Sequence, residues 1–127
     1  MDSNSAPEPT QIEVLASEAQ NGGQSERDAM INAFLEAVVV VPSGSDPSKG
    51  AFQPVLIEID GTSHMLVCDT LAAARDTSDL ALYVASMRGI DVVRGVTPGH
   101  AILVRTRTTG FAIEEALLAE IRARRVQ

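Results

Sequence analysis

Three segments of the chain carry apolar residues at helical spacing, and we expect each of them to form a helix. They are residues 10–21, 25–37 and 114–125, with apolar stripes at Ile12, Leu15, Ala16 and Ala19, at Met30, Phe34 and Ala37, and at Ile113, Leu117 and Ile121. Thr10 and Glu13 fit a capping box at the start of the first helix. That helix is short and thinly apolar, so it would be marginal alone and should dock on the same chain or on a partner.

Other apolar runs are rich in β-branched residues, which favours strands. We expect strands within residues 38–41, 54–59, 62–68, 80–87, 100–104 and 111–113, and short helices at 71–75 and 89–95. Asp60-Gly61 separates two of the strands, which predicts a hairpin whose turn residues both have positive φ. Helices mixed with hairpins predict an α+β fold, with a mixed or antiparallel sheet of about five strands and helices mainly on one face.

The length of 127 residues fits a single domain. Residues 1–9 include two prolines and show no periodicity, so we expect a disordered tail there. The predicted organisation is an acidic tail with a short amphipathic helix over residues 1–24, followed by one α+β domain over residues 25–127.

The charge distribution bears on partners. The net charge is −7, and residues 1–40 carry seven acidic residues against Arg27 alone. An acidic chain gains little from contacts with phosphates, so we expect no nucleic-acid partner. Arg122, Arg124 and Arg125 form the one basic cluster, and their position suits the C-terminal end of a helix dipole.

The predicted compartment is the cytoplasm. Cys68 is the one cysteine, so no disulfide can form within the chain, which favours a reducing environment. The N-terminal residues lack the pattern of a signal peptide. The longest apolar run, residues 37–41, is too short to cross a bilayer, so we expect no membrane contact.

Several segments resemble the SseB-type N-terminal domain, a bacterial family named for enhanced serine sensitivity. The resemblance covers residues 29–124. It rests on Phe34-Leu-Glu-Ala-Val-Val-Val-Val-Pro42, on Phe-Gln-Pro-Val-Leu with Asp60-Gly61, on Leu66-Val-Cys-Asp-Thr70, on Met87-Arg-Gly-Ile-Asp91, on Pro98-Gly99-His-Ala-Ile-Leu-Val104 and on Gly110-Phe-Ala-Ile113. The family often has Asn-Pro-Gly where this chain has Arg105-Thr106-Arg107. The resemblance implies no established catalytic residues and no cofactor.

Residues with catalytic or metal-binding chemistry are few. His64 and Cys68 share one face of a predicted strand but lie about 13 Å apart along it, too far for a thiolate–imidazole pair. We therefore expect a buried free cysteine and a surface or edge histidine. Short ligand pairs are missing, which argues against a metal site. Residues 44–50 lack the order of a phosphate-binding loop.

Arginines near the end of one predicted strand are the candidate ligand residues. Arg105 and Arg107 could hold a small anion or an amino-acid-type ligand, with Arg88 nearby in the same half of the chain. The alternative is that these arginines protect an edge strand by their charge. The leading prediction is a non-enzymatic interaction or regulatory domain that self-associates, for instance as a homodimer. Small-ligand binding is the second class, and an enzyme the third.

Overall fold

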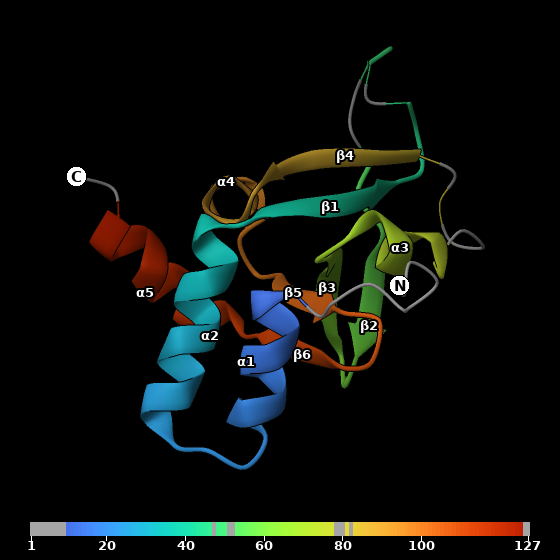
Figure 1. Ribbon diagram of the computed structural model, residues 1–127. Coiled ribbons are helices and arrows are strands. Elements are labelled where there is room, and N and C mark those ends of the chain that lie inside the picture. Colours follow the sequence, from blue (N-terminus) through green and yellow to red (C-terminus); the bar gives the residue numbers. More distant parts are fainter. Residues whose placement is uncertain (1–9, 47, 51–52, 78–80, 82, 126–127) are drawn as a thin grey trace, which may run out of the picture.

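The computed structural model describes residues 10–46, 48–50, 53–77, 81 and 83–125 (Figure 1). These residues form the helices α1 (Gln11–Ala19), α2 (Gln24–Glu36), α3 (Leu71–Arg75), α4 (Gly89–Gly95) and α5 (Glu115–Arg125). The strands are β1 (Val38–Ser43), β2 (Leu56–Ile59), β3 (Thr62–Cys68), β4 (Tyr83–Arg88), β5 (Ala101–Arg105) and β6 (Gly110–Ile113). The disordered tail predicted for residues 1–9 lies outside the described residues.

All six strands belong to one mixed sheet. Five of them follow the order β4-β1-β3-β5-β6, and β2 pairs with β3 beside this path. β3 and β5 run parallel, whereas the other paired strands run antiparallel. The predicted α+β class is therefore confirmed, with six strands instead of about five.

The main core lies between one face of the sheet and four helices. α1, α2, α4 and α5 bury their apolar sides there, against strand residues that include Val39, Val67, Ile102 and Ile113. Side chains alternate across a strand, so Val40 and Cys68 face the opposite side, where they pack with Ala73 and Ala74 of α3. Most of the helical cover thus lies on one face, as predicted.

The β2–β3 hairpin has the predicted turn. Asp60 and Gly61 both adopt positive φ, of 52° and 83°. Asp60 is the one non-glycine residue with positive φ within the described part of the chain. The Asp-Gly pair therefore sets this turn, as type I′ geometry requires.

Several element boundaries differ from the prediction. α2 begins at Gln24 and not at Ser25, because Gly23 precedes it and donates its N–H to the Glu26 carboxylate at 2.8 Å. That bond lowers the pKa of Glu26. β1 continues through Pro42 to Ser43, since both residues stay in register with β4. The strand expected from residue 80 begins at Tyr83, and residues 78–80 and 82 lie outside the described part.

β1 and β3 separate soon after they meet. Their register contains the pair Val40 and Cys68, and β2 then takes over the same edge of β3. Gly44 donates its N–H to the Gln53 carbonyl at 2.8 Å, and Leu66 donates to the Val55 carbonyl at 2.9 Å. Residues 53–55 therefore lie between the end of β1 and β3, and these two strands separate at this point.

Candidate functional site

The three arginines predicted for an anion site do not come together. Arg105 lies at the end of β5, and Arg107 follows in the turn before β6. Arg88 ends β4, which is separated from β5 by β1 and β3. Three strand spacings correspond to roughly 14 Å. Arg105 and Arg107 line a shallow hollow of about 330 Å³ formed by residues 103–110.

The turn beside these arginines is closed by its own hydrogen bonds. The Thr106 hydroxyl accepts the N–H groups of Thr108, at 3.3 Å, and Thr109, at 2.9 Å. The Thr108 hydroxyl donates to the Glu13 carboxylate of α1. The amides of Thr106, Thr108 and Thr109 are thus already bonded and a carboxylate lies against the turn, so the surroundings favour docking of α1 over binding of an anion.

Asp69 belongs to the same docking contact. It is buried, and its Oδ2 accepts a hydrogen bond of 2.5 Å from the Thr10 hydroxyl at the start of α1. Its Oδ1 is buried without a hydrogen-bond partner among the described residues. Burial raises the pKa of Asp69, and the nearby Glu13 charge adds to this, while the Thr10 bond acts in the opposite direction. We read Asp69 as part of the structural contact that holds α1 on the sheet.

His64 and Cys68 are both buried. The prediction for the cysteine is therefore confirmed, whereas the prediction of a surface or edge histidine is wrong. The His64 ring bonds through Nδ1 to the Thr62 carbonyl at 2.9 Å, so the folded hairpin itself provides the polar partner that lets this ring be buried. Burial is the main cause that raises the pKa of the Cys68 thiol to about 11, which keeps it protonated and unreactive at neutral pH.

The described residues offer little for a metal site or a membrane-spanning helix. The described ranges hold no group of three or more His, Cys, Asp or Glu side chains that could bind a metal ion. Among the same residues, no helix has both the length and the apolar character needed to cross a membrane.

Two basic residues of α5, Arg122 and Arg124, have structural partners. Arg122 donates from Nε to the Val93 carbonyl at 2.9 Å and from its guanidinium to the Val96 carbonyl at 2.8 Å. These two bonds satisfy carbonyls at the C-terminal end of α4. Arg122 also lies near the C-terminal end of its own helix. Arg124 pairs with Glu120 at 3.6 Å on the exposed side of α5, at the i,i+4 spacing that stabilises helices.

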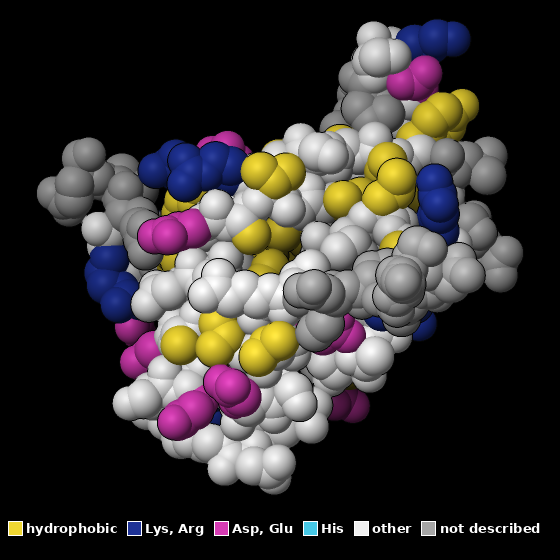
Figure 2. All heavy atoms as spheres, viewed as in Figure 1, with side chains coloured by type: hydrophobic (Ala, Val, Ile, Leu, Met, Phe, Trp, Pro, Cys, Tyr) yellow, Lys and Arg dark blue, Asp and Glu magenta, His cyan; other side chains and the backbone are white. Residues whose placement is uncertain are grey.

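β4 forms an open edge of the sheet. It pairs with β1 on one side, and no other strand of the described residues follows it in the strand order (Figure 1). Its sequence, Tyr-Val-Ala-Ser-Met-Arg, contains neither proline nor glycine, and Arg88 is its one charged residue. Tyr83 and Val84 are each 41% exposed, and Val38 on the neighbouring strand is 63% exposed. Hydrophobic side chains lie over the β1 and β4 region on the visible face (Figure 2).

The other sheet edges are shorter or carry charge. β2 and β6 have four residues each, and acidic residues lie in or just beyond them. Edge strands of natural proteins are usually protected by charge, proline, bulges or short length. β4 has little of this protection, which makes its edge a candidate interaction surface.

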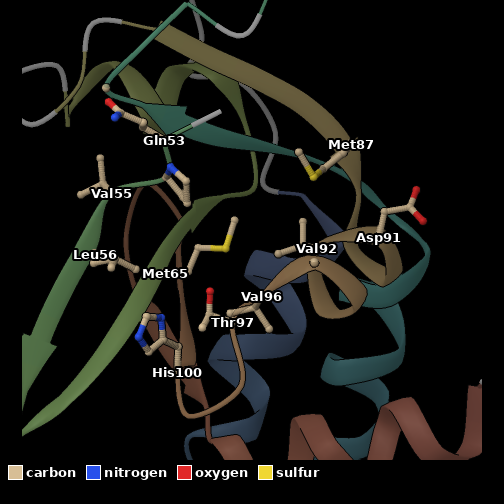
Figure 3. A pocket seen from close by; sticks show the side chains of 13 residues that line it. Gln53, Val55, Leu56, Met65, Met87, Asp91, Val92, Val96, Thr97 and His100 are labelled. Atoms are coloured by element: carbon tan, nitrogen blue, oxygen red, sulfur yellow. The ribbon is translucent and has the colours of Figure 1, made fainter. Parts of the chain in front are cut away.

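A cleft opens where β1 and β3 separate. Its volume is about 880 Å³. One wall is the start of β2 with residues 53–56, and the facing wall is α4 with the loop that follows it. Met65 and Met87 enter it from β3 and β4, and Val92 and Val96 from the facing wall (Figure 3). The cleft is a place where helices do not cover the main face of the sheet.

Polar side chains lie at the margins of this cleft. Thr97 and His100 lie close together at one end, and Gln53 lies at the other (Figure 3). Asp91 lines the outer side of α4, and its carboxylate points away from the cavity in the same view. Sequence reasoning missed these residues as a group because Gln53 lies before β2 and the others lie about 40 residues later, in or after α4. Nothing in the sequence pattern indicates that Met87 and His100 contribute to the same site.

Comparisons with protein-family models, with curated proteins and with solved structures gave no match for this chain. The SseB-type resemblance therefore stays a prediction that rests on the residue pattern alone.

Proposed function

We propose that this chain is a non-enzymatic interaction domain that self-associates by pairing β4 with β4 of a second copy. The observation that carries the proposal is the open, nearly uncharged edge of β4 with Tyr83, Val84 and Val38 exposed around it. Addition of a strand to such an edge satisfies its free N–H and C=O groups and buries its apolar side chains. A reducing compartment such as the cytoplasm suits the free, buried Cys68.

The sequence of β4 is compatible with a two-fold antiparallel pair. Residues directly opposite each other must lie on the same face of the combined sheet, so one residue must lie opposite its own copy, with the two-fold axis between them. If that residue is Ala85, Tyr83 lies opposite Met87 of the second copy, an aromatic–sulfur contact, and Val84 lies opposite Ser86. The two Arg88 side chains then lie at opposite ends, roughly 20 Å apart, at about 3.4 Å per residue.

The association should be weak and dependent on concentration. Pairing of one six-residue strand buries less surface than the interfaces of obligate dimers. This suits a regulatory contact that forms and dissociates. The alternative of a small-anion domain using Arg105 and Arg107 has less support, because Glu13 approaches the same turn.

Sedimentation velocity over a wide range of protein concentration tests the proposal. We expect the mean mass of the unchanged protein to rise towards that of a dimer. Val84→Lys should keep the protein monomeric, because lysine on an edge strand opposes strand pairing. Val14→Lys is the matched control, since Val14 on α1 is also 41% exposed but lies away from β4, and it should associate like the unchanged protein.

Two results would refute the proposal. One is a protein that stays monomeric at the highest concentration reached. The other is an equal loss of association in the Val14 and Val84 variants, which would show that β4 is not the contact.

A further inference from the structure

We infer that the cleft between β2 and α4 binds a small uncharged molecule with a flexible apolar body and one hydrogen-bonding end. The inference rests on the cleft of one chain and does not require self-association, although Met87 also belongs to the proposed β4 pair. The volume of about 880 Å³ lies within the range of cavities that hold small-molecule ligands. Those sites are mostly apolar, with a few polar groups that orient the ligand.

The apolar part of the lining suits a flexible body. Met65, Val92 and Val96 are largely buried and form the floor, where they are continuous with the main core. Met87 is half-buried and Leu56 is 50% exposed, so both offer apolar surface to an occupant. Methionine side chains are unbranched and polarisable, which lets them adapt to ligands of different shape.

The polar part of the lining determines where the ligand's polar end lies. Thr97 and His100 are neighbours at one end of the cleft (Figure 3). A hydroxyl and an imidazole can each donate or accept a hydrogen bond. A hydroxyl, carbonyl or amide group of the ligand would find partners there, with its apolar body extending along Met65 towards Met87.

Charge decides between neutral and ionised ligands. The lining contains no lysine or arginine among the described residues. Its one acidic residue, Asp91, points away from the cavity and pairs with Arg94 at 3.6 Å. An anion would therefore lose hydration without meeting a lysine or arginine, and a cation would lack a free carboxylate inside the cleft. These surroundings favour an uncharged ligand.

Three probes with one apolar body and different end groups test this inference: 1-octanol, octanoate and octylammonium. Binding is followed by NMR of ¹³C-labelled methionine methyl groups at a fixed protein concentration, so that self-association stays constant. Octanol should shift the methyl signals of Met65 and Met87. Met30 is an internal control, because it is buried in α2 and does not line the cleft. Octanoate and octylammonium should cause much smaller shifts.

A pair of variants on β2 locates the binding. Leu56→Arg should weaken octanol binding by about tenfold, the effect of losing one leucine-sized apolar contact, and should improve the binding of octanoate. Ile59→Arg is the control, since Ile59 is exposed on the same strand but does not line the cleft, and it should bind octanol normally. Both side chains are exposed, so neither change should prevent folding.

The inference is wrong if octanol leaves the Met65 and Met87 signals unchanged up to its solubility limit. It is equally wrong if octanoate binds as well as octanol to the unchanged protein, or if Met30 shifts as much as the two cleft methionines. The sedimentation results decide separately about β4.

Discussion

Gly89 shows how one residue sets the approach between two elements. It links β4 to α4 and donates its N–H to the Ala37 carbonyl at 2.9 Å. A Cβ atom at this position would lie 1.9 Å from the carbonyl oxygen of Phe34. Only glycine lets the chain pass this close to the end of α2. This contact holds α4 in the place where it forms one wall of the cleft.

Gly89→Ala should therefore destabilise the protein by about 2–3 kcal/mol, because the backbone of α2 must move to admit a methyl group. Urea unfolding followed by circular dichroism measures the change in free energy. Gly95→Ala at the end of the same helix is the control. A Cβ there meets no atom within 4 Å, so the free energy should change by no more than about 0.5 kcal/mol. Equal effects at both positions would contradict the close approach.

Asp69 should make stability depend on pH in an unusual direction for an aspartate. Burial raises its folded-state pKa, so its neutral form is favoured in the folded protein. That stabilisation is fully present below the ordinary aspartate pKa of 3.8 and is lost as the pH rises through the raised pKa. Asp69→Asn stays neutral at every pH and should remove this loss.

Unfolding free energies at neutral pH and below pH 3.8 test this expectation. The difference in unfolding free energy, variant minus unchanged protein, should be larger at neutral pH than in the acidic condition. Asp28→Asn, at an exposed position on α2, should show no such gain. A relative gain in the acidic condition would mean that the pKa of Asp69 is lowered and not raised.

The helix α1 illustrates how an element depends on its contacts. Its apolar stripe is short, yet Ile12, Ala16 and Ala19 are buried in the main core. Polar contacts from its two ends reinforce the docking, through Thr10 to Asp69 and through Gln20 to Thr109 at 2.9 Å. The choice that the sequence left open, between docking on the same chain and on a partner, is decided in favour of the same chain.

A charge placed under α1 should release it. Ala16→Glu puts a carboxylate among apolar side chains and should lower the stability by about 3 kcal/mol, or detach the helix at a similar free-energy difference. Limited proteolysis should then cut first within residues 11–23. Ser17→Glu is the matched control on the exposed side of the same helix, and it should change neither stability nor the cleavage pattern. Equal sensitivity of the two variants would argue against the packing of α1.

The cleft and the open edge of β4 are the two candidate surfaces of the whole molecule. β1 leaves β3 after a brief contact, and residues 53–55 enter between them. This separation opens the cleft on the main face. β4 is the outer strand because, among the described residues, it pairs with β1 alone. Charge is also distributed unevenly: acidic side chains predominate over α1 and α2, whereas acidic and basic side chains lie side by side near α4 and α5 (Figure 2). The region around β4 lies outside the acidic part, which suits contact between like copies.

Local patterns were enough to predict much of this fold. Helical stripes, β-branched runs and the Asp-Gly pair report on neighbours a few positions away, and these short-range preferences predicted the helices, the strands and the type I′ turn correctly. The free, buried cysteine was predictable for the same reason. The predicted start of α2 and the predicted end of β1 were less accurate. The Gly23 N–H bond to the Glu26 carboxylate extends α2 to Gln24, and pairing with β4 extends β1 to Ser43.

The strand order, the cleft and the open edge required the folded molecule. The apolar side chains of Val39, Val67 and Ile102 are nearly interchangeable in character, so their pattern does not say which strand lies beside which. The neighbours are selected by the total packing of distant segments, as in the parallel pairing of β3 with β5. For the same reason the predicted grouping of Arg88 with Arg105 did not survive, since closeness in sequence does not bring residues across a sheet. Met65, Met87 and His100 line one cleft only because β1 and β3 separate in the folded sheet.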